Sequence, residues 1–245
     1  MHSSLLKQHG LNNYIAGSDF NFRYQKVGKA IEKDISKIIE EMKIGLVGLY
    51  SGQQTHSANI AYADGQNGET FIYGRTFKET DGLITDQPGI GLFVKFADCT
   101  PVVLFDPVKK VQAIVHSGWR GTTKRISEKA IEKMTLEFGC NLDNLIAYLG
   151  PSIDIDHYEV GPEVYEAFQA FSNRDQFFRP SGDKYHLSML DANLDILTAA
   201  GIKPEQIQVE RASTYTESTL HSARDEGADY GLNGMLTIMG GQTKE

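Results

Sequence analysis

The chain has 245 residues, of which 40% are hydrophobic and 23% are charged, an ordinary balance for a globular protein. This composition excludes collagen, coiled coils and full-length disorder. The net charge of −8, together with the absence of any run of four Lys or Arg residues, argues against a protein that binds nucleic acid.

The cysteines and the apolar stretches indicate where the protein works. Two cysteines, Cys99 and Cys140, are too few for a disulfide framework. The first ten residues have no apolar signal core, and the apolar stretch 44–50 is far too short to span a bilayer. We therefore expect a soluble, cytoplasmic protein in a reducing environment, with no membrane partner.

The hydrophobic pattern predicts one α/β domain over residues 1–245, with a mixed sheet and no repeats. Apolar residues at helical spacing predict helices over 27–43, 122–138, 162–171 and 187–200. Apolar or alternating runs predict strands over 44–50, 57–63, 69–74, 89–97, 101–106, 111–117, 144–150 and 235–239. We expect residues 57–63 and 69–74 to flank the turn 64–68, and 101–106 and 111–117 to form a hairpin.

Three potential metal ligands lie at the ends of predicted strands. His56 follows a strand and a polar loop, Cys99 precedes the first strand of the hairpin, and His116 ends the second. The hairpin places Cys99 and His116 at the same end of the sheet. One thiolate and two imidazoles suit Zn²⁺, and three protein ligands leave a coordination position open for catalysis. On spacing alone, a surface or core histidine and a small buried cysteine are the favoured interpretation.

Four motifs resemble one known family. They are TDGLIT (80–85), FADCTPVVLFDP (96–107), AIVHSGWRGT (113–122) and LGPSIDIDHYEVG (149–161). They are similar to the multicopper polyphenol oxidase, or laccase, domain family, of the zinc-dependent purine nucleoside phosphorylase and peptidoglycan editing factor type. The resemblance implies a four-layer α/β/β/α domain with mixed β-sheets, and a zinc ion bound by His56, Cys99 and His116.

The resemblance also implies chemistry on purine nucleosides. Expected reactions are phosphorolysis of adenosine, inosine, guanosine and methylthioadenosine to base and ribose 1-phosphate, and deamination of adenosine. Copper oxidation is not expected, because the chain has seven histidines and none in a His-x-His pair. The expected partners are nucleosides and phosphate, with the protein a monomer or small homo-oligomer.

Further site residues follow from the same motifs. We expect Cys99, His116 and Asp98 to be catalytic, with Asp98 a hydrogen-bond acceptor or general base; a turn-capping role is the alternative. Arg120, at the start of a helix, is the first candidate for phosphate, and Gln54 could contact substrate or orient a ligand. Arg224 matches a family arginine near the pocket, although a salt bridge to a neighbouring acid would also explain it.

Two other functions compete with this interpretation. Cys99 could be the nucleophile of a cysteine hydrolase with His116 as its base, or the protein could edit a cell-wall precursor. A catalytically idle interaction protein would have no need for all three ligands. The chain departs from the family pattern at residues 18–30, at Ser213 and at Leu232, so contacts from both flanks to the substrate are the least predictable.

Overall fold

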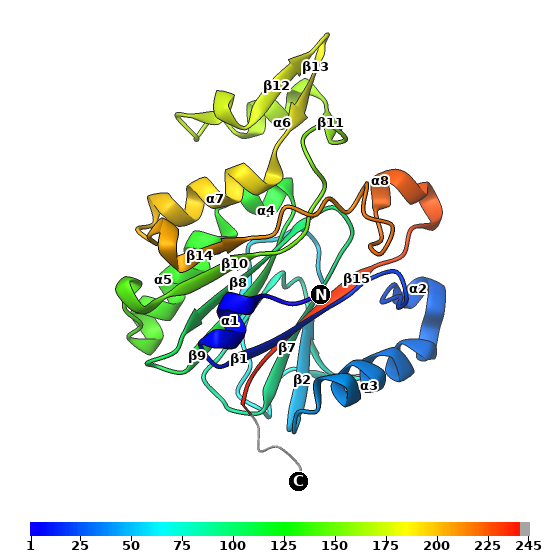
Figure 1. The fold of residues 1–245 in the computed structure, drawn as a ribbon, viewed down its shortest axis with the longest axis vertical. Coiled ribbons are helices and arrows are strands. Elements are labelled where there is room, and N and C mark those ends of the chain that lie inside the picture. Colours follow the sequence, from blue (N-terminus) through cyan, green and yellow to red (C-terminus); the bar gives the residue numbers. More distant parts are fainter. Residues whose placement is uncertain (241–245) are drawn as a thin grey trace.

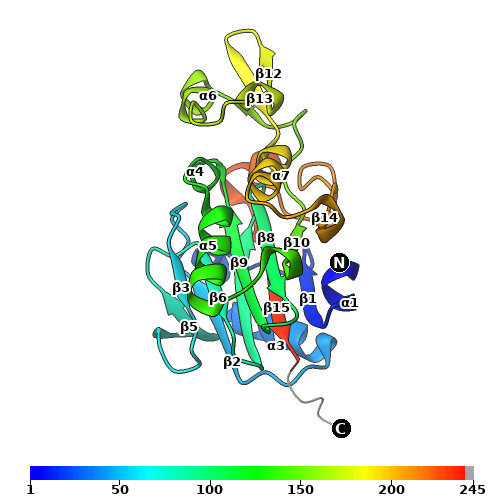
Figure 2. The ribbon, with the colours of Figure 1, turned by 90° about the vertical axis from the view of Figure 1, so that its left-hand side faces the viewer.

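The computed structural model describes residues 1–240 and contains two six-stranded sheets packed face to face (Figures 1 and 2). In the first sheet β2 runs parallel to β5 and β7, and the other pairs are antiparallel. Its strands, in spatial order, are β1 (Leu11–Ala16), β15 (Asn233–Met239), β7 (Ile90–Phe96), β2 (Gly48–Gly52), β5 (Gly74–Phe77) and β4 (Glu69–Phe71).

The second sheet is also mixed. Its β10–β14 and β3–β6 pairs are parallel, whereas the three central pairs are antiparallel. Its strands, in spatial order, are β14 (Ile207–Val209), β10 (Ile146–Leu149), β8 (Thr100–Asp106), β9 (Val111–Ser117), β6 (Gly82–Thr85) and β3 (Ile60–Tyr62).

Helices cover the outer face of each large sheet. Helix α3 (Ile31–Met42) buries Ile31, Ile35 and Ile38 against Phe93 of the first sheet, following its helical apolar spacing. Helices α5 (Ile126–Phe138) and α7 (Met189–Ala199) pack on the second sheet (Figure 2). The order helix, sheet, sheet, helix confirms the predicted α/β/β/α layers and mixed sheets.

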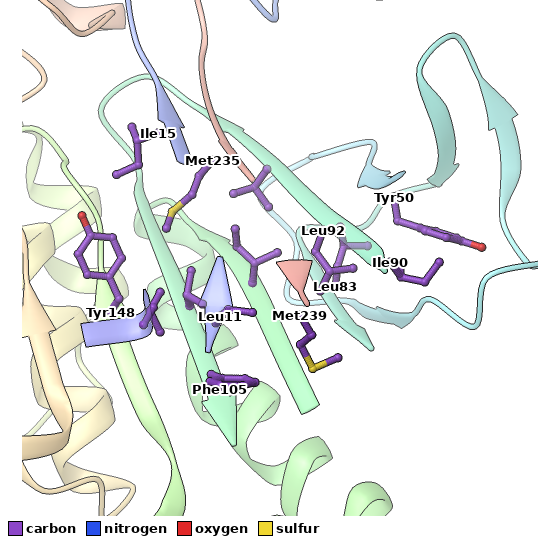
Figure 3. Close-up of a cluster of buried hydrophobic side chains, with 14 of the residues drawn as sticks. Leu11, Ile15, Tyr50, Leu83, Ile90, Leu92, Phe105, Tyr148, Met235 and Met239 are labelled. Atoms are coloured by element: carbon purple, nitrogen blue, oxygen red, sulfur yellow. The ribbon is translucent and has the colours of Figure 1, made fainter. Parts of the chain in front are cut away.

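The main hydrophobic core lies between the two sheets (Figure 3). Leu92 of β7, Phe105 of β8 and Met235 of β15 meet there, together with the fully buried aromatic rings of Tyr50 and Tyr148. Strands β8 and β9 are buried along their whole length because one face meets this core and the other meets α5. Their continuous apolar sequences reflect burial on both faces.

A third, smaller sheet projects beyond the two large ones, at the top of Figure 1. It consists of β11 (Glu159–Val160), β13 (Lys184–Leu187) and β12 (Phe178–Ser181), and packs with α6 (Pro162–Ala167) around its own aromatic cluster. The remaining helices are short. They are α1 (Ser4–Gln8), α2 (Tyr24–Val27), α4 (Trp119–Thr123), α8 (Ala223–Glu226), and the 3₁₀ turns Gly28–Ala30, Leu142–Asn144, Arg174–Gln176, Pro204–Gln206 and Gly227–Asp229.

The structure adds detail to two of the predictions. The segments 57–63 and 69–74 flank the turn as expected, but β3 pairs in the second sheet and β4 in the first, because the chain crosses between sheets. The helix predicted over 122–138 is divided into α4 and α5, because Arg125 adopts a left-handed backbone with φ of 56°. The division leaves α4 as a short helix that begins three residues after His116.

The β8–β9 hairpin is confirmed, with Pro101 opposite His116 and Thr100 opposite Ser117. Cys99 directly precedes β8, so the hairpin register places Cys99 and His116 at one end of the second sheet. Within residues 1–240, no helix is both long enough and apolar enough to cross a membrane.

Candidate metal centre

The structure brings the three predicted ligands together. The ligand atoms of His56, Cys99 and His116 all lie within 4.8 Å of one another. The Cys99 Sγ and His56 Nε2 atoms are 3.8 Å apart, and the two imidazole centroids are 5.1 Å apart. His116 is buried, whereas Cys99 and His56 are partly exposed, so the cluster is accessible from one side.

Two of the three ligands lie where the chain passes from the first sheet to the second, and His116 lies in β9 of the second sheet. His56 is in the connection from β2 to β3, and Cys99 is in the short turn from β7 to β8. Two residues of these turns, His56 and Asp98, have left-handed backbones with φ of 58° and 82°. Such conformations are costly for residues other than glycine and need support from their surroundings.

Asp81 supports the backbone of His56, and it lies in a third crossing, between β5 and β6. Its carboxylate accepts hydrogen bonds from the backbone N–H groups of Thr55, His56 and Ser57, at 3.0, 3.1 and 2.7 Å. The same carboxylate lies 2.9 Å from Nδ1 of His116. When Nδ1–H donates to a carboxylate, the imidazole presents its Nε2 lone pair to a metal. Asp81 therefore orients both histidines.

The charges of this group are coupled. Burial would raise the pKa of Asp81, but its hydrogen bond and ionic interaction with His116 prevail and lower the pKa to about 2. Burial would also raise the pKa of the Cys99 thiol, yet His116 and His56 lower it. Conversely, burial disfavours the charged form of His116, whereas Cys99 and Asp81 raise its pKa. The cysteine thus favours its thiolate, the form that ligates metals.

Gly118 leaves room for the ligands. A Cβ atom at this position would lie 2.7 Å from His56 Cδ2 and 2.8 Å from Cys99 Sγ. Gly118 has an ordinary extended backbone, with φ of −76°, so its requirement is for space and not for conformation.

The three ligands line a cavity of about 1020 Å³. Aromatic side chains form part of its wall: Tyr24 lies edge-on to Phe71 with ring centroids 5.5 Å apart, and Tyr230, Trp119 and Tyr158 also line it. A cavity of this size is at the upper end of the range for small-molecule sites, which is about 300–1,000 Å³.

Asp98 fastens the C-terminal segment to the cavity. Its carboxylate accepts hydrogen bonds from the hydroxyls of Thr214 and Ser222, each at 2.7 Å, and from the Arg224 backbone N–H at 2.8 Å. The Arg224 guanidinium then lies at the exposed rim and donates to the carbonyl of Glu159 at 3.0 Å. By accepting these three hydrogen bonds, Asp98 holds the C-terminal segment against the cavity.

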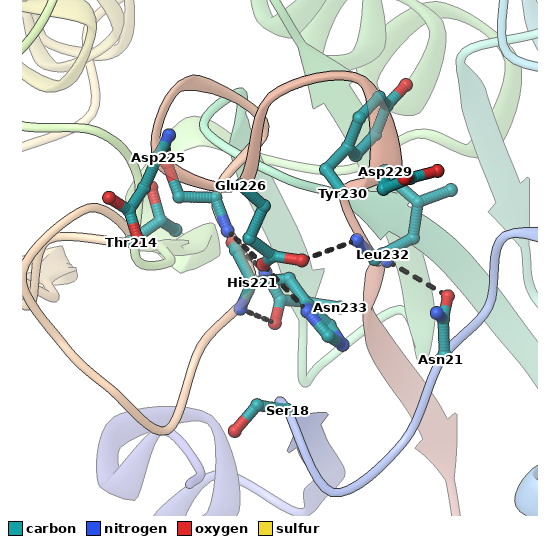
Figure 4. A network of polar contacts seen from close by, with 12 residues as sticks. Ser18, Asn21, Thr214, His221, Asp225, Glu226, Asp229, Tyr230, Leu232 and Asn233 are labelled. Carbon is teal, nitrogen blue, oxygen red and sulfur yellow. Dashed lines mark hydrogen bonds and ion pairs between the residues drawn. The ribbon is translucent and has the colours of Figure 1, made fainter.

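A second network holds the rest of that segment (Figure 4). The Glu226 carboxylate lies 2.8 Å from Nδ1 of His221 and accepts the N–H of Gly231 at 2.8 Å. The N–H of Leu232 donates to the side chain of Asn21. The network holds in place the loop on which Arg224 and Tyr230 lie, and both of these residues line the cavity. The two segments of the chain that depart from the family pattern, near the N-terminus and near the C-terminus, therefore both contribute to the site.

The other two predicted residues have different surroundings. Gln54 lines the cavity, but its amide is bonded to the Lys95 backbone: Oε1 accepts the N–H at 2.9 Å, and Nε2 donates to the C=O at 2.6 Å. Arg120 is exposed, and its guanidinium stacks 4.1 Å above the Trp119 ring, outside the cavity lining.

Three residues of the site escaped the sequence-based prediction. Asp81 belongs to the TDGLIT motif, but only the structure reveals its contacts with both histidines. Tyr158 lies in another quoted motif, and burial raises the pKa of its hydroxyl. Lys95 is a cation within an apolar strand, GLFVKFA. This position was the one feature of the sequence that could have identified Lys95 as a site residue.

The buried Asp81 predicts a specific loss of stability in acid. A carboxylate with a lowered pKa stabilises the fold above its unfolded value of 3.8, and this contribution is lost as pH falls toward 2. Between pH 5 and pH 2, metal-free protein should lose about 2 kcal/mol of unfolding free energy from this group. Asp81→Asn should remove that part of the pH dependence, measured by chemical denaturation across the pH range.

Asp143→Asn is the matched control, because the Asp143 side chain is 68% exposed and pairs with Lys203 in solvent. It should leave the acid profile close to wild type. An Asp81→Asn profile that equals the wild type over the same range would contradict the role given to the buried carboxylate.

Known proteins are similar to this chain over most of its length. The family model described as multi-copper polyphenol oxidoreductase laccase matches residues 3–239. A purine nucleoside phosphorylase from Bacteroides thetaiotaomicron is 34% identical over 215 residues, covering 82% of this chain and 75% of that protein. An adenosine deaminase, RL5, from an unknown prokaryotic organism is 34% identical over 197 residues, covering 78% of this chain and 75% of that protein.

Solved structures share the fold. The crystal structure of the hypothetical protein YfiH from Bacillus licheniformis has a TM-score of 0.87 and 26% identity, covering 96% of this chain and 94% of that one. The predicted resemblance is therefore confirmed: the chain belongs to the multi-copper polyphenol oxidoreductase laccase family.

Proposed function

We propose that the protein is a zinc-dependent purine nucleoside phosphorylase that also deaminates adenosine. The observation that carries this proposal is the His56, Cys99 and His116 ligand set, which lies in the wall of a large cavity and is open to it. Relatives named purine nucleoside phosphorylase and adenosine deaminase support the choice of substrate class.

The donor set fits zinc. One thiolate and two imidazoles form a typical tetrahedral zinc environment with a fourth position available. Ideal tetrahedral zinc distances place sulfur and nitrogen about 3.5 Å apart, close to the 3.8 Å between Cys99 Sγ and His56 Nε2. Among residues 1–240 this is the one cluster of three such ligands, which does not support a multicopper centre.

Zinc in this site would supply Lewis-acid chemistry, making a nucleophile available near neutral pH and stabilising developing negative charge. The chain's own residues perform the other tasks. Asp81 holds both histidines in their ligating orientation, and the aromatic wall offers flat surfaces against which a purine ring packs. Asp98 acts here by holding Arg224 at the rim, where the guanidinium can meet an anionic group.

The two arginines that were predicted to bind phosphate differ in their position relative to the cavity. Arg224 lines the cavity and remains a candidate for phosphate. Arg120 lies outside the lining, so a role for it in phosphate binding stays a prediction that requires its side chain to move from Trp119. A cytoplasmic location is part of the proposal, because a reducing compartment keeps Cys99 available as a thiolate ligand.

A cysteine hydrolase is the second candidate, and one observation favours it. Asp81, His116 and Cys99 form a carboxylate–imidazole–thiol series, and the neighbouring histidines lower the pKa of the thiol. A nucleophile, a base and a group that orients the base define the general arrangement of covalent catalysis. His56 distinguishes the two functions, because a metal centre requires it and a Cys–His pair does not.

The test combines metal content with turnover. Protein purified without chelator should contain close to one zinc per chain by plasma mass spectrometry. With adenosine or inosine and phosphate it should release the free base, and with adenosine alone it should form inosine. His56→Ala should lose the zinc and about 100-fold or more of both activities, whereas the exposed His9→Ala should retain them.

Two results would contradict the proposal. One is wild-type protein that contains no zinc and forms neither base nor inosine. The other is metal-free protein whose activity survives His56→Ala but is lost in proportion to alkylation of Cys99, which would establish the cysteine hydrolase instead.

Gly118 provides a steric test of the metal centre. Gly118→Ala would place a methyl group against both His56 and Cys99, so zinc affinity should fall about tenfold or more while the fold is retained. Gly121→Ala, in the short helix that follows Gly118, is the control, because its Cβ would meet no atom closer than 3.4 Å. Competition with a chromophoric chelator measures both affinities, and equal values for the two variants would refute the steric argument.

A further inference from the structure

The cavity is electropositive although the chain is acidic overall. Its charged residues comprise four cations and two acids, against a net charge of −8 for the whole chain. One of the two acids, Asp98, already accepts three hydrogen bonds from other residues of the protein. An excess of cations in a partly enclosed cavity favours an anionic ligand. The charged lining residues are Arg23, Lys78, Lys95, Arg224, Glu69 and Asp98.

Three of the four cations are already engaged. Lys78 forms an ion pair with Glu69 at 2.8 Å. Arg23 stacks 4.1 Å from the Tyr230 ring and donates to two backbone carbonyls of the segment before β15. Arg224 is exposed at the rim and donates to the carbonyl of Glu159.

Lys95 is different. It is partly buried on β7, and within residues 1–240 its ammonium has one hydrogen-bond acceptor, the Gly52 carbonyl at 3.1 Å, and no ion pair. An ammonium carries three N–H donors, so two remain for a ligand. Burial lowers the pKa of Lys95 to about 8, and the charge of Asp81 offsets only part of this effect. A desolvated cation gains from pairing with an anion.

The position of Lys95 is fixed relative to the metal centre. It is four residues before Cys99 on the same chain segment. The Gln54 side chain, two residues before His56, is hydrogen-bonded to both the N–H and the C=O of Lys95. The lysine backbone is thus connected to the segments that carry two of the three ligands. Gln54 serves as a positioning residue for the lysine.

We propose that Lys95 forms the anion subsite of the cavity and binds inorganic phosphate, the co-substrate of phosphorolysis. The choice of phosphate rests on the proposed function, whereas the cationic subsite rests on the geometry. In phosphorolysis a phosphate oxygen bonds to C1′ of the ribose while the bond from C1′ to the base breaks. The base leaves with the electron pair and takes a proton from solvent. Lys95 holds the phosphate and transfers no proton.

The experiment measures phosphate directly. The zinc-loaded protein is titrated with inorganic phosphate by ³¹P NMR or calorimetry, and the KM for phosphate is measured with inosine. Lys95→Met keeps an unbranched side chain that is one atom shorter and removes its charge. It should weaken phosphate binding and raise this KM about 10- to 100-fold, with a smaller change in the KM for inosine. Zinc content and melting temperature verify that the variant is folded.

Lys203→Met is the matched control, because Lys203 lies outside the cavity lining and pairs with Asp143 at the exposed surface. It should keep the wild-type affinity for phosphate. AMP is titrated in parallel, and binding through Lys95 that is tighter for AMP than for phosphate would overturn the assignment to free phosphate.

The remaining outcomes separate the inference from the proposed function. Wild-type affinity for phosphate in Lys95→Met, or no phosphate binding by the wild type, overturns the subsite. Phosphate binding that depends on Lys95, in a protein that cleaves no nucleoside, supports the subsite and refutes the phosphorylase.

Discussion

The site depends on the hydrogen bonds that the buried Asp81 carboxylate forms. It accepts three consecutive backbone N–H groups from the loop of His56 and also meets Nδ1 of His116 in β9. These hydrogen bonds satisfy a charge that would otherwise be costly to bury. They also stabilise the left-handed backbone of His56, which places its imidazole beside Cys99. One carboxylate therefore supports the loop and orients two ligands.

The position of the site follows from the way the two sheets are connected. The chain passes from the first sheet to the second at β2–β3, at β5–β6 and at β7–β8, and these crossings carry His56, Asp81 and Cys99. The core between the sheets packs the strands that flank these crossings. Asp98 then ties the C-terminal segment to the β7–β8 crossing, which closes one wall of the cavity.

Local patterns predicted the parts of the site that lie on long, buried strands. The apolar runs of β8 and β9 revealed the hairpin, and with it the proximity of Cys99 and His116. His56 was a candidate ligand from its polar loop, but its proximity to Cys99 and His116 required the family resemblance, because a loop between sheets has no periodicity. The role proposed for Lys95 could not be predicted from the sequence, because the cavity around it is formed by residues from both ends of the chain. The third sheet was not predicted because its strands are only two to four residues long.

The central claim is that one metal ion binds directly to ligands from three separate segments. Zinc X-ray absorption spectroscopy on the purified protein tests this most directly. The account predicts one sulfur at about 2.3 Å and two imidazole nitrogens at about 2.0–2.1 Å from the metal. A coordination shell without sulfur, or one with a single imidazole, would contradict it.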